Sequence, residues 1–242
     1  MINNFLINRV LSVTGFDSEN NVLYRLTQPQ NVGLSTTSET AEVVDALGTP
    51  IAVFDRSKSA ELTGENAIFD MSLLAEQHGV EVQQTASSVP CFQTIAVADI
   101  ANGLKYEALT APKPQVYALN KDSSIGQVIE GASVNGKTVS LPDTVTEGQV
   151  LVVYEHTPTA ATMVVVSADK FATAHKVVVE ILGCDVCNTE DLVYAYLIME
   201  NGKLSSDTDL TFGTDLVHGF TISAQVSYCS PDKRLFYIVI PE

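Results

Sequence analysis

Tryptophan is absent from this sequence, and charged residues are scarce at 17% of its 242 residues. Positive charge is the scarcer sign, because 13 Lys and Arg stand against 29 Asp and Glu, a net charge of −16. The excess of acid is the same before and after Thr110, so it is not an acidic tail. Such a surface repels phosphate and argues against conventional DNA or RNA binding. Without tryptophan, or aromatic residues interleaved with Lys and Arg, a base-stacking platform is also excluded.

Long apolar runs are also missing, since none approaches the roughly 20 residues that a membrane helix needs. The stretch from Met1 to Val10 carries Asn and Arg within its apolar part and lacks the pattern of a signal peptide. Four cysteines in a chain of this length do not suggest a secreted disulfide framework. We therefore expect synthesis in a cytoplasm and no membrane partner.

Catalytic signatures are absent as well: there is no nucleophile elbow, phosphate-binding glycine loop or dinucleotide fingerprint. The sharpest small motif is Cys184-Asp-Val-Cys187. Zinc would need two further ligands, and a thioredoxin-like pair would need a helix directly after it, where a strand is predicted. We favour structural cysteines and keep metal or redox roles as lesser alternatives.

The scattered histidines (His78, His156, His175 and His218) favour surface or structural roles. The sequence predicts no catalytic residue, cofactor or metal.

What the chain does contain is short runs of Val, Ile, Tyr and Thr separated by turn residues, the pattern of a mainly β fold. A first hairpin is predicted from Arg9–Phe16 and Val22–Leu26, and a second around Gly48-Thr49-Pro50. One short helix is predicted at about 70–79, begun by Asp70, and a second helical turn at about 168–172. Further strands are predicted at Leu104–Leu109, Val116–Leu119, Gln127–Ile129, Thr138–Leu141, Val150–Glu155, Thr162–Val166, Lys176–Leu182, Leu192–Met199, Leu210–Phe212, Phe220–Tyr228 and Leu235–Ile240.

Two stretches favour irregular structure. Gln28–Ser38 is long, polar and uncharged, which is typical of an extended loop or arm. Thr110–Pro114 is the best candidate for a joint, although it could equally be a stiff crossover inside one domain.

The most informative segment runs from Glu39 to Gly79. Its first strand places Glu42, Val44 and Ala46 on one face and Ala41, Val43 and Asp45 on the other, so acidic positions occur on both faces. Such a strand suits a sheet with one face towards water or a partner subunit. An ordinary amphipathic edge hairpin is the alternative interpretation.

This segment resembles the tail tube proteins of tailed bacteriophages. The similarity lies in a hairpin around Asp45-Ala-Leu-Gly48, then Lys58-Ser-Ala-Glu-Leu-Thr-Gly-Glu-Asn66, then a short helix ending in Gln77-His-Gly79. The later order is similar too: Val165-Val-Ser-Ala168, the strand Lys176–Leu182, then Asp207–Phe212 and Phe220–Ser227.

The resemblance implies a β-sandwich or barrel-like protomer with a flanking helix, six copies of which form a ring. Rings stack into the virion tail tube through which viral DNA passes without specific binding. Inner strands of neighbouring copies would join edge to edge, which removes exposed strand edges. The stretch Gln28–Ser38 would be the arm that reaches the adjacent ring. The implied partners are copies of this chain and other tail proteins.

The resemblance also gives the acidity a use, because a channel wall that attracted phosphate would hold DNA. The strands assigned to this wall carry six acids and one lysine, and a slip of one residue would exchange their faces. These candidate channel or inter-subunit residues are Glu39, Glu42, Asp45, Asp55, Lys58, Glu61 and Glu65.

Size is the departure from the family pattern, because a minimal tube subunit is shorter. We expect one composite β domain over 1–242, with a tube core at about 9–110 and 150–242 and an outward-facing insertion at about 112–149. Two alternatives stay open: a capsid decoration or head-fibre protein, and a small redox or zinc-binding β protein that uses Cys184 and Cys187.

Overall fold

The computed structural model describes residues 4–85, 87–208, 210–211, 213, 217–226 and 233–241. This part of the chain is mainly β with two short helices, which confirms the predicted fold class. The chain divides into two compact units: unit 1 comprises 1–82 and 164–242, and unit 2 comprises 83–163.

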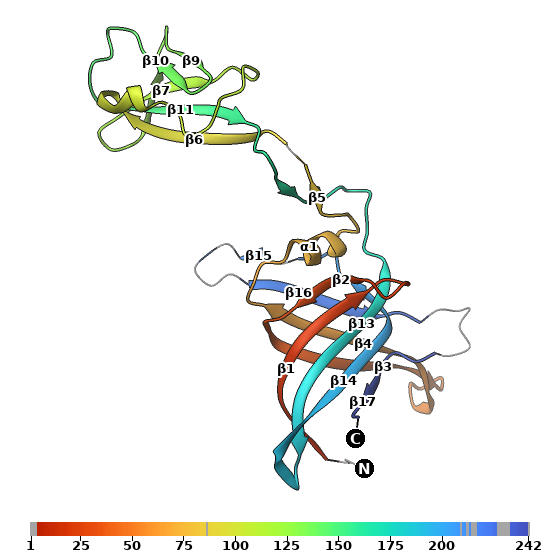
Figure 1. Cartoon of the computed structure of the whole chain (residues 1–242). Helices are drawn as coiled ribbons and strands as arrows, with labels where there is room; N and C mark the ends of the chain where they lie inside the picture. Colours follow the sequence, from red (N-terminus) through yellow and green to blue (C-terminus); the bar gives the residue numbers. More distant parts are fainter. Residues whose placement is uncertain are drawn as a thin grey trace. The chain divides into compact units, whose positions relative to one another are not determined.

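Unit 1 is built on one large antiparallel sheet with the strand order β2-β1-β13-β14-β16-β4-β3 (Figure 1). Two short strands join it: β15 pairs with β16, and β17 pairs with β14. The bounds are β1 (Phe5–Phe16), β2 (Val22–Leu26), β3 (Pro29–Val44), β4 (Pro50–Asn66), β13 (Ala174–Asp185), β14 (Asn188–Leu204), β15 (Leu210–Thr211), β16 (Val217–Ala224) and β17 (Tyr237–Val239).

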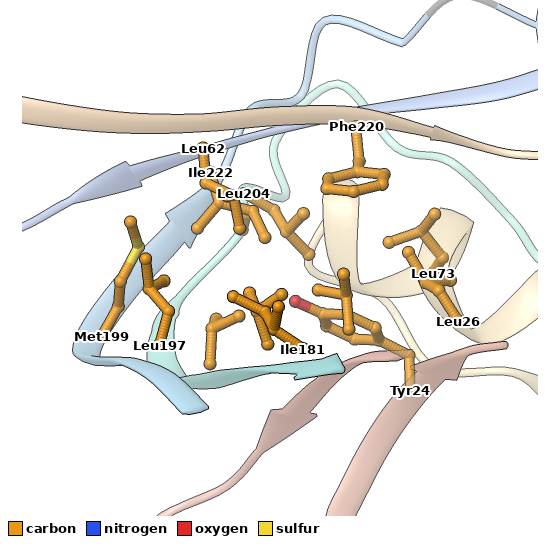
Figure 2. Packing of buried hydrophobic residues seen from close by; sticks show 14 of the residues in the cluster. Tyr24, Leu26, Leu62, Leu73, Ile181, Leu197, Met199, Leu204, Phe220 and Ile222 are labelled. Carbon is orange, nitrogen blue, oxygen red and sulfur yellow. The ribbon is translucent and has the colours of Figure 1, made fainter. Parts of the chain in front are cut away.

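The sheet folds over onto itself, so that β1, β2, β13 and β14 face β4 and β16 across a single core (Figure 2). Strand β13 illustrates how side chains enter this core. Its inward positions Val177, Val179 and Ile181 are buried and alternate with less buried ones. Figure 2 shows Phe220 and Ile222 of one layer above Tyr24 and Ile181 of the other. The result is the predicted sandwich-like arrangement. The fully buried large side chains of this core include Tyr24, Leu26, Leu62, Leu73, Met199, Leu204 and Ile222.

Helix α1 (Met71–Gln77) confirms the predicted helix. Asp70 is its N-cap, and the Asp70 carboxylate accepts hydrogen bonds from the backbone N–H groups of Ser72 and Leu73. Gly79 follows the C-cap with a φ of +62°, and a Cβ there would collide with the backbone of Phe171. Leu73 is fully buried, which docks the helix on the core (Figure 2).

The second helical turn predicted at about 168–172 is a single turn that begins at Ser167 and does not continue as a helix. The segment contains a single turn, closed by the N–H of Lys170 and the carbonyl of Ser167 at 3.3 Å. Strand β13 begins at Ala174, so too few residues remain for a helix. The second helix is instead the 3₁₀ helix η1 (Val97–Asn102), which was not predicted.

The loop predicted at Gln28–Ser38 is also wrong, because most of it forms the first half of β3. This stretch pairs with β4 from Pro29 opposite Asn66 to Ser38 opposite Lys58. The polar residues of this stretch belong to a half-exposed edge strand. Such a strand alternates polar and apolar positions, so a polar composition does not require a loop.

Unit 2 contains a four-stranded antiparallel sheet in the order β6-β11-β7-β8, a β9–β10 hairpin and the helix η1. A two-stranded ribbon of β5 and β12 marks its ends. Its strands are β5 (Gln83–Gln84), β6 (Val89–Ala96), β7 (Gln115–Leu119), β8 (Ile125–Val128), β9 (Ser133–Asn135), β10 (Thr138–Ser140), β11 (Gln149–His156) and β12 (Thr162–Met163). Its separate core consists of Ile95, Leu104, Ala108, Val116, Val139, Val150, Val152 and Tyr154.

The boundaries of unit 2 differ from the expected insertion at 112–149, which lies wholly inside it. The reason is the pairing of β6 with β11 along the full length of both strands, which ties 89–96 to the same sheet as 149–156. The candidate joint Thr110–Pro114 also lies inside unit 2. The outward orientation of the insertion stays a prediction.

Candidate assembly surface

The β3–β4 hairpin is the candidate functional element of unit 1. Its strands pair from Pro29 opposite Asn66 to Val44 opposite Pro50. Near its base, Ala60, Leu62 and Asn66 are buried. From Ser35 to Ser59 no side chain is buried, on either face of the hairpin. The outer part of the hairpin therefore extends beyond the core of its own unit.

The tip of this hairpin is held by Asp45, whose carboxylate accepts hydrogen bonds from the N–H groups of Leu47 and Thr49, both at 2.8 Å. These bonds lower the pKa of the exposed Asp45 carboxyl, those to Thr49 and then Leu47 contributing most. Asp45 was predicted on a strand but lies in the turn, where its bonds have a structural role.

The register divides the other candidate residues between two faces. Glu39, Glu61 and Glu65 lie on the face turned away from the buried side chains of β4. Two contacts confirm this grouping: the Ser57 hydroxyl donates to the Glu39 carboxylate at 3.3 Å, and Glu65 accepts from Asn31 at 3.0 Å. We call this surface the outer face. It consists of Ser35, Thr37, Glu39, Ser57, Ser59, Glu61, Thr63 and Glu65, continued by Gly219, Thr221 and Ser223 of β16 and Lys203 of β14.

Glu42, Asp55 and Lys58 lie on the opposite face, beyond the end of the core. A β-bulge at Arg56, where the register shifts between Glu39 and Thr40, brings Asp55 to that side. The alternation predicted for Glu42 and Val44 holds, because both lie on this opposite face of β3, which ends at Val44. The seven candidates therefore do not form one cluster.

The end of the hairpin is apolar, a feature that the sequence analysis missed. It carries six exposed apolar side chains, and Leu47 at the tip is 91% exposed. These side chains lie on both faces of the hairpin, and exposed apolar groups gathered in one region usually mark a contact surface. We call this group the apolar tip: Val43, Val44, Leu47, Ile51, Val53 and Phe54. The available signal was two apolar runs on either side of a turn, which break the alternation expected of an amphipathic hairpin.

Strand edges are open at the same place. β3 is the last strand of the sheet, and no strand within the described ranges pairs with its free edge. β4 pairs with β16 from Glu61 to Asn66, and the described part of β16 leaves 50–60 without a ladder on that side. Unpaired edges of this length promote pairing with another chain.

Of the two cysteines of the Cys-x-x-Cys motif, Cys184 lies near the end of β13, opposite Leu192 of β14, and Cys187 lies in the turn between these strands. Cys184 is buried and Cys187 is exposed, and the N–H of Cys187 donates to the Asp185 carboxylate at 2.8 Å. Cys229 lies outside the described residues. Among the residues that the structure describes, no group of three His, Cys, Asp or Glu side chains is placed to hold a metal ion.

Two of the four histidines are structural. His175 packs edge-on against Tyr24, with Nε2 and the hydroxyl 3.0 Å apart. His218 is fully buried in β16, and its Nε2 lies 2.9 Å from Oε1 of Gln77 in α1. Burial lowers the pKa of both imidazoles.

The model of the YomU/Tube protein family, a phage-derived tube family, matches residues 5–233. The chain belongs to this family. The match spans both units and includes the whole β3–β4 hairpin. A search of curated proteins finds no match.

Membership of a tube family confirms the resemblance seen in the sequence and makes a structural virion component the coarse function of the chain. No helix within the described residues is long and apolar enough to cross a membrane.

Proposed function

We propose that this YomU/Tube chain is a self-assembling tail tube subunit, whose copies form stacked rings around a channel for viral DNA. The observation that carries the proposal is the β3–β4 hairpin, which exposes apolar side chains and unpaired edges together. Six rotated copies in each ring, as the resemblance implies, would let each hairpin reach the next subunit.

The apolar tip supports self-assembly for an energetic reason. Each large apolar side chain that leaves water on association contributes about 1.5–3 kcal/mol. Main-chain bonds along the free edge of β3 add register and direction. The remaining inter-subunit candidates, Glu42, Asp55 and Lys58, lie on a hairpin face that the core of their own unit does not cover. Such side chains can pair with opposite charges on a neighbour.

The outer face supports the role of channel wall. Its described side chains are small hydroxyl groups and carboxylates, with Lys203 at one border. Glu39, Glu61 and Glu65 on it would repel the phosphates of a passing duplex, so that DNA stays mobile. The opposite face of the same strands covers the core at Ala60 and Leu62, so at the base of the hairpin only the outer face is free to line a channel.

The wall can be tested with the triple variant Glu39→Gln, Glu61→Gln and Glu65→Gln in a virion. The expected result is normal tails and slower DNA release, measured as ejection kinetics after triggering. The matched control is Glu130→Gln, Asp143→Asn and Glu147→Gln in unit 2, which removes the same charge and should leave release unchanged. Unchanged kinetics in the first variant, or equal slowing in both, would contradict the proposed wall.

Assembly itself can be tested by electron microscopy of the purified protein. Rings or tubes with a bore near duplex width support the proposal. Monomers or trimers at all concentrations would instead favour a decoration or fibre protein that binds a capsid from outside.

A further inference from the structure

We propose that unit 2 carries a binding site for an acidic sugar, meaning a carbohydrate ring that bears a carboxylate or phosphate. The site is an open pocket of about 700 Å³, within the range typical of small-ligand sites. All of its lining residues belong to unit 2, so the inference is independent of how the tube assembles. Its functional side chains are Lys105, Tyr106, Lys137 and His156, with Thr157 and Thr159 beside them.

Lys105 and Tyr106 belong to the segment Leu104–Leu109, which was predicted as a strand and is instead a loop. This loop is rigidly held, because five of its six backbone N–H groups donate hydrogen bonds to fixed acceptors. The acceptors are the carbonyls of Lys137, Gly136 and Glu155, at 2.8, 3.0 and 2.7 Å, the Gln93 side chain at 2.9 Å and the Tyr154 hydroxyl at 3.4 Å. Satisfying these groups orders the loop before any ligand arrives, so binding costs less conformational entropy.

The anchor beneath this loop is itself buried. Tyr154 is 3% exposed, and its hydroxyl donates to Gln93 Oε1 at 3.2 Å while accepting from the N–H of Tyr106. Gly103 has a φ of +70°, and a Cβ there would approach the Lys137 carbonyl to 2.5 Å. The close contact between the loop and the β9–β10 turn therefore requires glycine.

The ring pair supplies a flat, partly apolar surface. Tyr106 and His156 stack with ring centroids 4.2 Å apart and an interplanar angle of 12°. The Lys105 ammonium lies 5.1 Å from the centroid of the Tyr106 ring. Tyr106 is 39% exposed, so part of its side chain is accessible to the C–H groups of a sugar. The hydroxyls of Thr157 and Thr159 can bond to sugar hydroxyl groups.

The charge distribution favours an acid with few charges over a polyanion. Unit 2 has four Lys and seven Asp or Glu, and two of those four lysines line this pocket. Two ammonium groups with one carboxylate, Glu107, can hold a single anionic group by charge-assisted hydrogen bonds. A nucleic acid would extend past the pocket over an acidic surface, which would repel it.

The test uses the full chain and ligand-detected NMR with four probes. The probes are tetragalacturonate for the carboxylate, mannose 6-phosphate for the phosphate, cellotetraose as a neutral sugar and an oligothymidine. We expect at least one acidic sugar to bind, and to bind about tenfold or more tightly than the two other classes. Which acidic probe binds distinguishes the carboxylate from the phosphate.

Two double variants with the same charge change locate the site. Lys105→Gln with Lys137→Gln should weaken binding of the acidic probe about tenfold or more, because both pocket cations are lost. Lys113→Gln with Lys121→Gln removes the other two lysines of unit 2 and should leave binding within about twofold. Tyr106→Ala should weaken binding of the acidic sugar probe and leave the NMR signals of folded unit 2 unchanged.

Three results would overturn the proposal: no binding of either acidic probe, equal weakening by the two lysine pairs, or tighter binding of the neutral sugar or the oligonucleotide.

Discussion

His218 and Gln77 are fully buried polar side chains of unit 1, and together they join α1 to the sheet. The Asp70 N–H donates to His218 Nδ1 at 3.5 Å, so a proton on Nε2 can be donated to Gln77 Oε1 at 2.9 Å. Gln77 Nε2 then donates to the Gly219 carbonyl at 3.0 Å. Every member of this chain of bonds is satisfied only while the imidazole is neutral.

Gln77→Leu is therefore expected to destabilise the protein by about 1–3 kcal/mol, because the buried imidazole N–H would lose its acceptor. The measurement is urea denaturation followed by circular dichroism. Glu76→Leu, the neighbouring and less buried position of α1, is the control and should change stability much less. Equal stabilities for the Gln77 variant and the unchanged protein would mean that the bond contributes nothing.

The same bonds predict a pH dependence. Burial lowers the pKa of His218 in the folded protein below its ordinary value of 6.5, and Asp70 offsets this in part. His218 therefore takes up its proton at a higher pH in the unfolded chain than in the folded state. The free energy of unfolding should therefore decrease as the pH falls below about 6.5, by at most about 1.4 kcal/mol per pH unit for this group.

NMR of the histidine ring carbons gives the direct reading. In the folded protein the resonance of His218 should change to that of the imidazolium at a lower pH than in the unfolded chain, where the ordinary pKa is about 6.5. Titration of His218 near pH 6.5 in the folded protein would contradict the proposed arrangement.

At the scale of elements, the β3–β4 hairpin links sequence pattern to assembly. Ile51→Asp with Phe54→Asp places two charges in the apolar tip, where association would have to bury them. We expect subunits that fold normally but no longer form tubes, as measured by circular dichroism and electron microscopy. Because both side chains are exposed, the free energy of unfolding of the subunit should change by less than about 0.5 kcal/mol.

Phe92 offers a matched control, since it is 70% exposed on β6 of unit 2, against 58% for Phe54. Phe92→Asp with Ile125→Asp should leave tube formation intact. Tubes from the Ile51 and Phe54 variant at ordinary concentrations would remove the apolar tip from the assembly interface.

The sequence was informative about elements whose local chemistry agrees with their fold. The hairpin at Val22–Leu26 and the helix begun by Asp70 were predicted closely, because turn and capping residues act over a few positions. The nature of Gln28–Ser38 was not predicted, because its strand character depends on a partner about 30 residues away. The face of Asp55 likewise depended on a bulge at Arg56 that no local pattern marks.

At the scale of the whole molecule, two cores of separate composition support two independent units. The fifteen residues of the first buried cluster all belong to unit 1, and the eight of the second all belong to unit 2. The chain enters and leaves unit 2 through paired strands, with Gln84 opposite Thr162. Paired residues of an antiparallel ribbon lie about 5 Å apart, so a short turn could join them.

Replacing residues 85–161 with a two-residue Asn-Gly turn is therefore expected to leave unit 1 folded and able to form tubes. The measurements are circular dichroism, size-exclusion chromatography and electron microscopy. The control is unit 2 expressed alone as 83–163, which should fold by its own core. An insoluble or unfolded shortened chain would show that the two cores depend on each other.

Unit 1 combines the apolar tip of its hairpin with a strong excess of negative charge, because it has nine Lys and Arg against 22 Asp and Glu. The two act over different distances: repulsion reaches about 8 Å at physiological salt, whereas apolar contact requires touching surfaces. If the proposed tube forms, free subunits would be held apart until an ordered template aligned the first hairpins, after which each added ring would supply the next template. Under such kinetic control, growth would start where a nucleus is provided and not in the surrounding pool of unassembled protein.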